Sequence, residues 1–184
     1  PLMNYEIESQ ISNTIKKIIL SRPEIQSIAI ISSDRQFYYS DDNAIRGGIR
    51  ELLPFEDVLE EARKYGGKVC WYMDSQDGVV KNIFLARVIY HQDTFDEIGL
   101  QVILVRKNFI ETVYQGLTKG MQNIVILSGD YELIASRNIE DGTLPDIASF
   151  GSLEPEKGSR IDKVLDAMIS HTTVKGTGWK VIAY

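Results

Sequence analysis

Two distant segments of this 184-residue chain align with each other without a gap, as an internal repeat. Residues 25–40 read IQSIAIISSDRQFYYS, and residues 121–136 read MQNIVILSGDYELIAS. The two segments share six residues, at Gln26/Gln122, Ile28/Ile124, Ile30/Ile126, Ser32/Ser128, Asp34/Asp130 and Ser40/Ser136. All of them fall on even-numbered positions, and the side chains of a strand alternate between its two faces. The repeat therefore predicts one face of a β-hairpin built twice, although two unrelated hairpins of common sequence would also explain it.

The stretch after the first hairpin predicts one helix and three strands. Residues 41–53 read as a polar loop, and a helix is expected from Pro54 to a stop at Gly66-Gly67. The apolar face of this helix holds Phe55, Val58, Leu59 and Ala62. Strands are expected at 69–73, 82–90 and 99–106. This order indicates an antiparallel sheet of five strands with helical cover, which is an α+β plan rather than βαβ alternation.

The second hairpin opens a shorter copy of the same plan. A loop is expected over residues 137–160, followed by a helix whose apolar face holds Ile161, Val164, Leu165 and Met168. Strands are expected at 172–174 and 179–184, with a glycine-rich turn at 176–178 between them. We therefore expect this copy to have fewer strands and a smaller core than the first.

Two further helices are expected outside the sheets. Isoleucines at helical spacing run along residues 7–19 up to Arg22-Pro23, where a helix must end. A second apolar face, at Ile110, Val113, Tyr114 and Leu117, predicts a helix between the two copies. The predicted α+β chain thus has a long N-terminal helix over 1–22, a first module over 23–110, a connecting helix over 111–120 and a smaller second module over 121–184.

Composition excludes several classes of protein. Lys and Arg total 20 against 26 Asp and Glu, so the net charge is −6, and no nucleic-acid partner is expected. The single cysteine, Cys70, excludes an internal disulfide and a cysteine-based zinc cluster. No apolar run reaches the length of a membrane-spanning helix, and no signal peptide is visible. With its start at Pro1, the chain is expected to be a piece of a longer protein.

Motifs for catalysis or cofactor binding are missing from the sequence. It contains no phosphate-binding loop, dinucleotide fingerprint, serine-hydrolase elbow or zinc-protease motif. The two histidines, His91 and His171, lie in different copies without a carboxylate at ligand spacing, and both are expected at the solvated surface. We therefore expect no catalytic site, no metal and no cofactor in this chain.

Four segments occur here in an order that is typical of one family. They are the first hairpin, NIFLARVIYHQDTFDEIGLQVILVRKNFIETVYQGL at 82–117, NIVILSGDYELIAS at 123–136 and the closing TGWKVIAY at 177–184. In this order they resemble the double-Cache extracytoplasmic sensor domains of bacterial membrane histidine kinases, in which two PAS-like modules follow one long helix. The resemblance implies a membrane-distal module near 23–110 and a membrane-proximal module near 121–184. It also implies flanking transmembrane helices and a kinase outside this chain.

One group of residues in the first module predicts a ligand site. Alternation along 83–90 puts Arg87 on a face with aliphatic residues, and a buried guanidinium needs an anionic partner. Tyr39, Trp71 and Tyr72 come from the same expected sheet and would pack the body of a small molecule, with residues 74–80 as a cap. The alternative is that Arg87 is exposed or paired with Asp74, and that the aromatic residues belong to the core.

The class of ligand stays open. Amino-acid-binding relatives of this family carry an Arg-x-Trp-Tyr pattern in the distal pocket, whereas Val69-Cys70 precede Trp71-Tyr72 here. This departure puts an amino-acid ligand in doubt.

The expected function is non-enzymatic sensing at the cell membrane. We expect an extracytoplasmic domain that binds a small molecule in the distal module and relays the change to the membrane. The alternatives are a spacer that binds nothing, the input domain of a chemoreceptor or a diguanylate cyclase, and an intracellular PAS- or GAF-type module with a cofactor. A homodimer through the isoleucine-rich first helix is a further expectation, against the alternative that this helix only covers the sheets.

Overall fold

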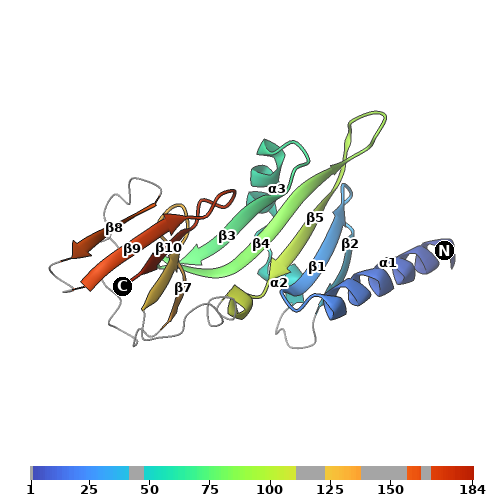
Figure 1. Ribbon diagram of the computed structural model, residues 1–184. Coiled ribbons are helices and arrows are strands. Elements are labelled where there is room, and N and C mark those ends of the chain that lie inside the picture. The colour runs from blue at the N-terminus through green and yellow to red at the C-terminus, as the bar shows by residue number, and fades with distance from the viewer. Residues whose placement is uncertain (1, 42–47, 111–122, 138–156, 163–166) are drawn as a thin grey trace. The chain divides into compact units, whose positions relative to one another are not determined.

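The computed structural model describes residues 2–41, 48–110, 123–137, 157–162 and 167–184 (Figure 1). The chain divides into two compact units. The first consists of Pro1–Asp74 and Asn82–Phe109, and the second of Ser75–Lys81 and Ile110–Tyr184. An N-terminal helix precedes antiparallel strands, which confirms the α+β class.

Helix α1 spans Leu2–Ser21 and opens the first unit. It ends just before Pro23, because proline lacks the N–H that would continue the helix and its ring clashes with the preceding turn. Ile15 and Ile19 are buried against Ile28 of strand β1, which spans Ile25–Ser32. The isoleucine stripe therefore lies on a helix, as its spacing predicts, and one edge of this helix packs on the sheet.

Among the described residues, five strands run wholly or partly in the first unit. Strand β1 pairs antiparallel with β2 (Phe37–Asp41) on one side and with β5 (Glu97–Val105) on the other. Strand β4 (Val79–Tyr90) pairs antiparallel with β5, and β3 (Cys70–Gln76) pairs with β4. The order is β2-β1-β5-β4-β3, so the three strands predicted after the helix are confirmed with shifted bounds.

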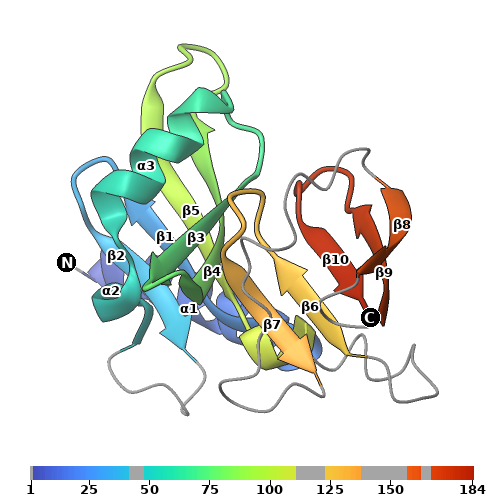
Figure 2. The ribbon, with the colours of Figure 1, turned by 90° about the vertical axis from the view of Figure 1, so that its left-hand side faces the viewer.

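Helices α2 (Gly48–Leu52) and α3 (Phe55–Lys64) cover the face of this sheet opposite α1 (Figure 2). Val58, Leu59 and Ala62 of α3 are buried against this face, as their helical spacing predicts. The helix ends where Gly66 takes a positive φ of 56°, a conformation that glycine adopts without strain. Helix α2 lies within residues 41–53, which were expected to be a polar loop. This short helix is stabilised because its Ile49 is fully buried in the same core.

The second unit repeats the strand order of the first. Strand β6 (Ile124–Leu127) pairs with β7 (Leu133–Arg137) and with β10 (Lys180–Ala183). Strand β9 (Ala167–Thr173) lies between β10 and β8 (Lys157–Asp162). The order β7-β6-β10-β9-β8 matches the first sheet strand for strand. The expectation of fewer strands is therefore wrong, since the described residues include five strands of this order in each copy.

The two repeated hairpins share their turn as well as their strands. The serine at the end of each first strand, Ser32 or Ser128, accepts a hydrogen bond on Oγ from the N–H four residues later, at 3.1 and 3.0 Å. The residues before that N–H, Arg35 and Tyr131, have positive φ angles of 67° and 65°. Unrelated hairpins have no reason to share this detail, so one motif is used twice.

The helix predicted around 161–168 is wrong. Ile161 lies in β8 and Met168 in β9, where the two residues face each other across the pair. Apolar residues at this spacing fit two short strands as well as a helix, and pairing with β10 decides in favour of strands. Val164, Leu165 and residues 111–120 of the expected connecting helix lie outside the described residues; 107–110 are helical.

The turn between β3 and β4 belongs to the second unit. Asp77 and Gly78 have positive φ angles of 53° and 74°, as a two-residue hairpin turn requires. The carbonyl of Gly78 accepts the N–H of Leu133 at 2.9 Å, and Val80 is fully buried. Residues 74–80, expected to cap a ligand pocket, therefore form a hairpin end that packs with β7.

Candidate functional site

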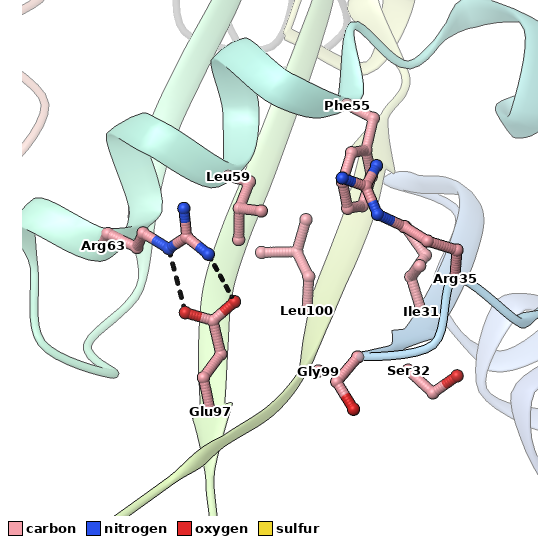
Figure 3. Close-up of a pocket in the computed structure, with 10 residues that line it drawn as sticks. Ile31, Ser32, Arg35, Phe55, Leu59, Arg63, Glu97, Gly99 and Leu100 are labelled. Atoms are coloured by element: carbon pink, nitrogen blue, oxygen red, sulfur yellow. Dashed lines mark hydrogen bonds and ion pairs between the residues drawn. The ribbon is translucent and has the colours of Figure 1, made fainter.

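A pocket of about 120 Å³ opens in the first unit where α3 meets one end of the sheet (Figure 3). That volume equals the share of about four molecules of liquid water. Three elements line it: the end of β1 with its turn, helix α3 and the start of β5. Their lining residues are Ile31, Ser32, Ser33, Arg35, Phe55, Leu59, Arg63, Glu97, Gly99 and Leu100.

The β1–β2 turn holds Arg35 at one side of the pocket. Its N–H donates to the carbonyl of Ser32 at 2.9 Å, and its backbone stays at a positive φ. The guanidinium lies over the ring of Phe55, 4.2 Å from the ring centroid, and Nη1 lies 2.8 Å from an oxygen of Glu56. Stacking and ion pairing from α3 therefore orient this cation.

An ion pair between α3 and β5 forms the other side. Arg63 donates from Nε and Nη2 to the two carboxylate oxygens of Glu97, each at 2.9 Å (Figure 3). The hydrogen bonds to Glu97 raise the pKa of the Arg63 guanidinium above its usual value. The Arg63 side chain is 54% exposed, so the pair shapes the wall and adds at most about 1 kcal/mol to stability.

The floor of the pocket is apolar, and strands β1 and β5 lie close together there. Ile31, Leu59 and Leu100 are buried there. Gly99 has no side chain because a Cβ at this position would lie 2.5 Å from the carbonyl oxygen of Ile31. The missing Cβ lets β5 approach β1 closely.

The corresponding strand positions in the second unit carry larger side chains. Lys180 faces Leu127 across the strand pair, as Leu100 faces Ile31 in the first unit. The residue before it is Trp179, 9% exposed, where the first unit has Gly99. The Lys180 ammonium lies 5.1 Å from the ring centroid of Tyr131. The two copies thus share a backbone plan and differ in side chains at this point.

Two of the predicted ligand residues lie on the α3 face of the first sheet. Tyr39 pairs with Ala29, which belongs to the core under α3, and Tyr39 is 40% exposed. Tyr72 packs against the same core, with its ring centroid 6.4 Å from that of Phe84. Burial raises the pKa of the Tyr72 hydroxyl.

The other two lie on the opposite face. Arg87 is exposed, and its Nε donates to the Gln101 side chain at 2.7 Å. Trp71 follows the buried Cys70, so strand alternation turns it away from the core under α3. The four residues are therefore split between two faces, and none lines the pocket of Figure 3. Asp74, the alternative partner of Arg87, accepts a hydrogen bond from Asn82 at 2.8 Å.

Sequence reasoning missed the residues that do line this pocket. Arg63 and Glu97 are 34 positions apart, and no local pattern links them. Arg35 had a signal, because it stands inside the repeat where the second copy has Tyr131. Differences between two copies of one motif mark the places where one copy has a separate task.

The described part of the chain has no cluster of three or more metal-ligating side chains. Cys70 is buried, and burial raises the pKa of its thiol, so the reactive thiolate is disfavoured. Among the helices of the described residues, none has the length and apolar character to cross a membrane.

Comparison with solved structures identifies the fold. The extracellular domain of rpHK1S-Z16, a protein classed with the histidine kinases, matches with a TM-score of 0.65 at 16% identity, over 99% of this chain and 83% of that one. The ligand-binding domain of the Pseudomonas aeruginosa PAO1 amino acid chemoreceptor PctC, solved with GABA, matches with a TM-score of 0.63 at 14% identity, over 95% and 79%.

An extracellular ligand-binding receptor from Desulfohalobium retbaense DSM5692 matches with a TM-score of 0.66 at 13% identity, over 94% of this chain and 32% of that one. No protein-family model matches the sequence, and no curated protein matches it significantly. The chain therefore has the Cache-type fold of extracellular sensor domains from histidine kinases and chemoreceptors.

Proposed function

We propose that this chain is the extracytoplasmic ligand-sensing domain of a membrane-bound two-component histidine kinase. Transmembrane helices would flank it in the full-length protein, and the kinase would lie beyond them. The proposal is supported by the Cache-type fold, which extends over 99% of this chain in the match to an extracellular domain of a histidine kinase.

We further propose that a small solute binds in the first unit, at the pocket between α3 and the β1–β2 turn. One observation carries this step: the same backbone motif occurs twice, and one copy has Gly99 and Leu100 where the other has Trp179 and Lys180. The first copy thus has an apolar floor at the strand positions where the second copy has an indole ring and an ammonium group.

The signal would pass from the pocket through the sheet. A solute that contacts α3 and the β1–β2 turn favours the arrangement of these elements that binds it best. Strand β1 carries the pocket on one face and Ile28 on the other, and Ile28 packs against Ile15 and Ile19 of α1. A shift of β1 would therefore be felt by α1, which we propose as the element that leads to the membrane.

A thermal-shift screen of the 184-residue chain against sugars, organic acids, amines, amino acids and peptides tests solute binding. A ligand at 100 times its dissociation constant stabilises a protein by about 2.7 kcal/mol, which raises the melting temperature by several degrees. We expect at least one class to do so. No shift across the panel would favour the alternative of a spacer that binds nothing.

The site predicted from sequence is kept as a second location for the solute. Tyr39 and Tyr72 lie on one face of the sheet and Trp71 and Arg87 on the other, so one small solute would contact one of these two pairs. Binding that is lost in Arg87→Ala and kept in Arg35→Ala would favour this location over the pocket.

The output partner has one specific alternative. The structural match to the chemoreceptor PctC is nearly as extensive as the match to the histidine-kinase domain. The input domain of a chemoreceptor, or of a diguanylate cyclase, therefore remains the alternative function. Topology mapping of the full-length protein and the sequence that follows Tyr184 decide between them, and a cytoplasmic location of this segment would contradict all three.

We also propose that two copies associate through α1. An apolar groove of about 370 Å³ runs beside this helix, lined by Ile11, Ile15 and Ile18 of α1, by Ile28 and Ile30 of β1, and by a few polar residues. Ile7 and Ile18 are 48% and 41% exposed along the same edge of the helix. A second copy would remove this apolar surface from water.

A further inference from the structure

The pocket of the first unit has an excess of positive charge. Arg35 and Arg63 both line it, and Glu97 is the one carboxylate among its lining residues. Glu56, which pairs with Arg35 from outside the lining, is a second carboxylate at its edge. The lining itself therefore favours an anionic ligand that takes the place of Glu56 on Arg35.

The two arginines are engaged to different degrees. Arg63 gives two nitrogens to the two oxygens of Glu97, so the fork of its guanidinium is already used. Arg35 approaches Glu56 through Nη1, and these two side chains are 56% and 72% exposed. An exposed pair of this kind contributes little to stability, so a ligand carboxylate replaces Glu56 at small cost. Arg35 is therefore the cation available to a ligand.

Arg35 is also held in place before any ligand arrives. The turn fixes its backbone, and its guanidinium lies flat enough on Phe55 to be 4.2 Å from the ring centroid. A side chain that is already ordered loses less conformational entropy on binding. This favours a ligand whose planar charged group pairs with the guanidinium fork, as a carboxylate does.

The floor sets the size and polarity of the rest of the ligand. Ile31, Leu59 and Leu100 offer apolar contact, and the volume of about 120 Å³ admits a body of only a few carbon atoms. In the second unit, Tyr131 stands in place of Arg35 and Lys180 in place of Leu100, so these described positions do not repeat the cation over an apolar floor.

We propose that this pocket binds a small monocarboxylate, with the carboxylate on Arg35 and a short apolar body on Ile31, Leu59 and Leu100. The inference rests on the proposed function, because it names the ligand class of the sensing site.

Straight-chain carboxylates from acetate to hexanoate, titrated into the 184-residue chain by calorimetry and thermal shift, test the proposal. We expect binding that strengthens with chain length until the pocket is full and then weakens. Butyramide has nearly the same shape as butyrate without its charge, and we expect it to bind roughly tenfold to a hundredfold more weakly, as the loss of a charge-assisted hydrogen bond implies.

Three variants locate the site. Arg35→Gln keeps most of the side chain and removes the charge, so it should weaken butyrate binding by roughly tenfold or more. Arg35→Lys keeps the charge without the fork and should fall between Arg35→Gln and the parent chain. Arg22→Gln is the matched control, since Arg22 is an exposed arginine of the same unit that pairs with Glu24 outside the pocket, and it should bind like the parent chain.

Equal binding of butyrate and butyramide, or unchanged butyrate binding in Arg35→Gln, would overturn the carboxylate proposal. If no carboxylate binds but another class in the solute panel does, the proposed function stands and this inference fails. If nothing in either set binds, both fail. Loss of butyrate binding in a further variant, Arg87→Gln, with binding kept in Arg35→Gln, would overturn the inference and move the site to the residues predicted from sequence.

Discussion

The close approach of two strands at Gly99 is the tightest steric requirement at the pocket. A Cβ there would lie 2.5 Å from the carbonyl oxygen of Ile31, a distance that real Cβ atoms do not show. Because both groups belong to paired backbones, neither moves away freely, and β1 and β5 would have to separate. The pocket floor therefore depends on a residue that contributes no side chain.

We predict that Gly99→Ala lowers the free energy of unfolding by about 1–3 kcal/mol, the range for overpacking a close contact. Gly129→Ala is the matched control, since its nearest neighbour would be the Gly178 carbonyl oxygen at 3.8 Å, an ordinary contact. The control should be neutral or slightly stabilising. Urea denaturation followed by circular dichroism measures both, and equal effects would contradict the steric argument.

The buried thiol of Cys70 gives a prediction for pH. Burial is the largest cause that raises the thiol pKa above its ordinary value of 9.0. The unfolded chain therefore ionises at lower pH than the folded one, so this contribution is fully present below pH 9 and is lost as pH rises above it. We expect stability to fall from pH 8 to 10, with a smaller fall in Cys70→Ala. Tyr72 and Tyr184 add to the same trend at higher pH, since burial raises their pKa values too. An identical slope in both proteins would count against the assignment to Cys70.

At the scale of elements, the repeated turn offers an internal comparison. Ser128 is 1% exposed, and its Oγ accepts the N–H groups of Asp130 and Glu132 at 3.2 and 3.0 Å. Ser32 makes the equivalent bond to Gln36 at a more exposed turn. Ser128→Ala leaves two partly buried N–H donors without this acceptor, which costs about 1 kcal/mol or more.

We therefore expect Ser128→Ala to destabilise the chain more than Ser32→Ala, because water can replace the lost oxygen at the exposed turn. Chemical denaturation of the two variants measures the difference. A larger loss in Ser32→Ala would mean that burial does not govern the cost of this motif.

Helix α1 carries the prediction about association. If two copies meet along its exposed isoleucine edge, Ile18→Glu should abolish the dimer by placing a charge in the seam. Leu20→Glu is the matched control, because Leu20 is 77% exposed and lies two positions further round the helix, away from that edge. Sedimentation equilibrium of the parent chain and both variants gives the answer. A monomeric parent chain would remove the proposed dimer.

The elements also explain what sequence alone could predict. Helices α1 and α3 were predictable because each has an apolar stripe of helical period and ends at a proline or a glycine pair. A helix was wrongly predicted at 161–168 because Ile161 and Met168 fit a helical period. The pairing of this region with distant strands decides its structure instead. The pocket was hidden for the same reason: Arg63 meets Glu97 only after α3 packs on the sheet. The exposure of Arg87 and its pairing with Gln101 could not be predicted either, because strand alternation assigns a residue to a face of the sheet but does not say what covers that face.

At the scale of the whole molecule, one strand serves both units. Residues 75–81 pack with the second unit, while the chain on either side of them belongs to the first. Within β4, Val80 is fully buried in the part assigned to the second unit, and Val88 is 2% exposed in the part assigned to the first. A single strand therefore has a buried valine in each of the two units.

The two tryptophans make this arrangement testable, because Trp71 reports on the first unit and Trp179 on the second. Val80→Ala and Val88→Ala remove the same atoms from buried sites of one strand, and each should cost on the order of 2 kcal/mol. In a Trp71→Phe background, we expect Val80→Ala to shift the urea transition of Trp179 fluorescence more than Val88→Ala does. In a Trp179→Phe background, the order should reverse for Trp71. If Val80→Ala moved only the Trp71 transition, the hairpin end would belong to the first core, and the second unit would have to be stable without it.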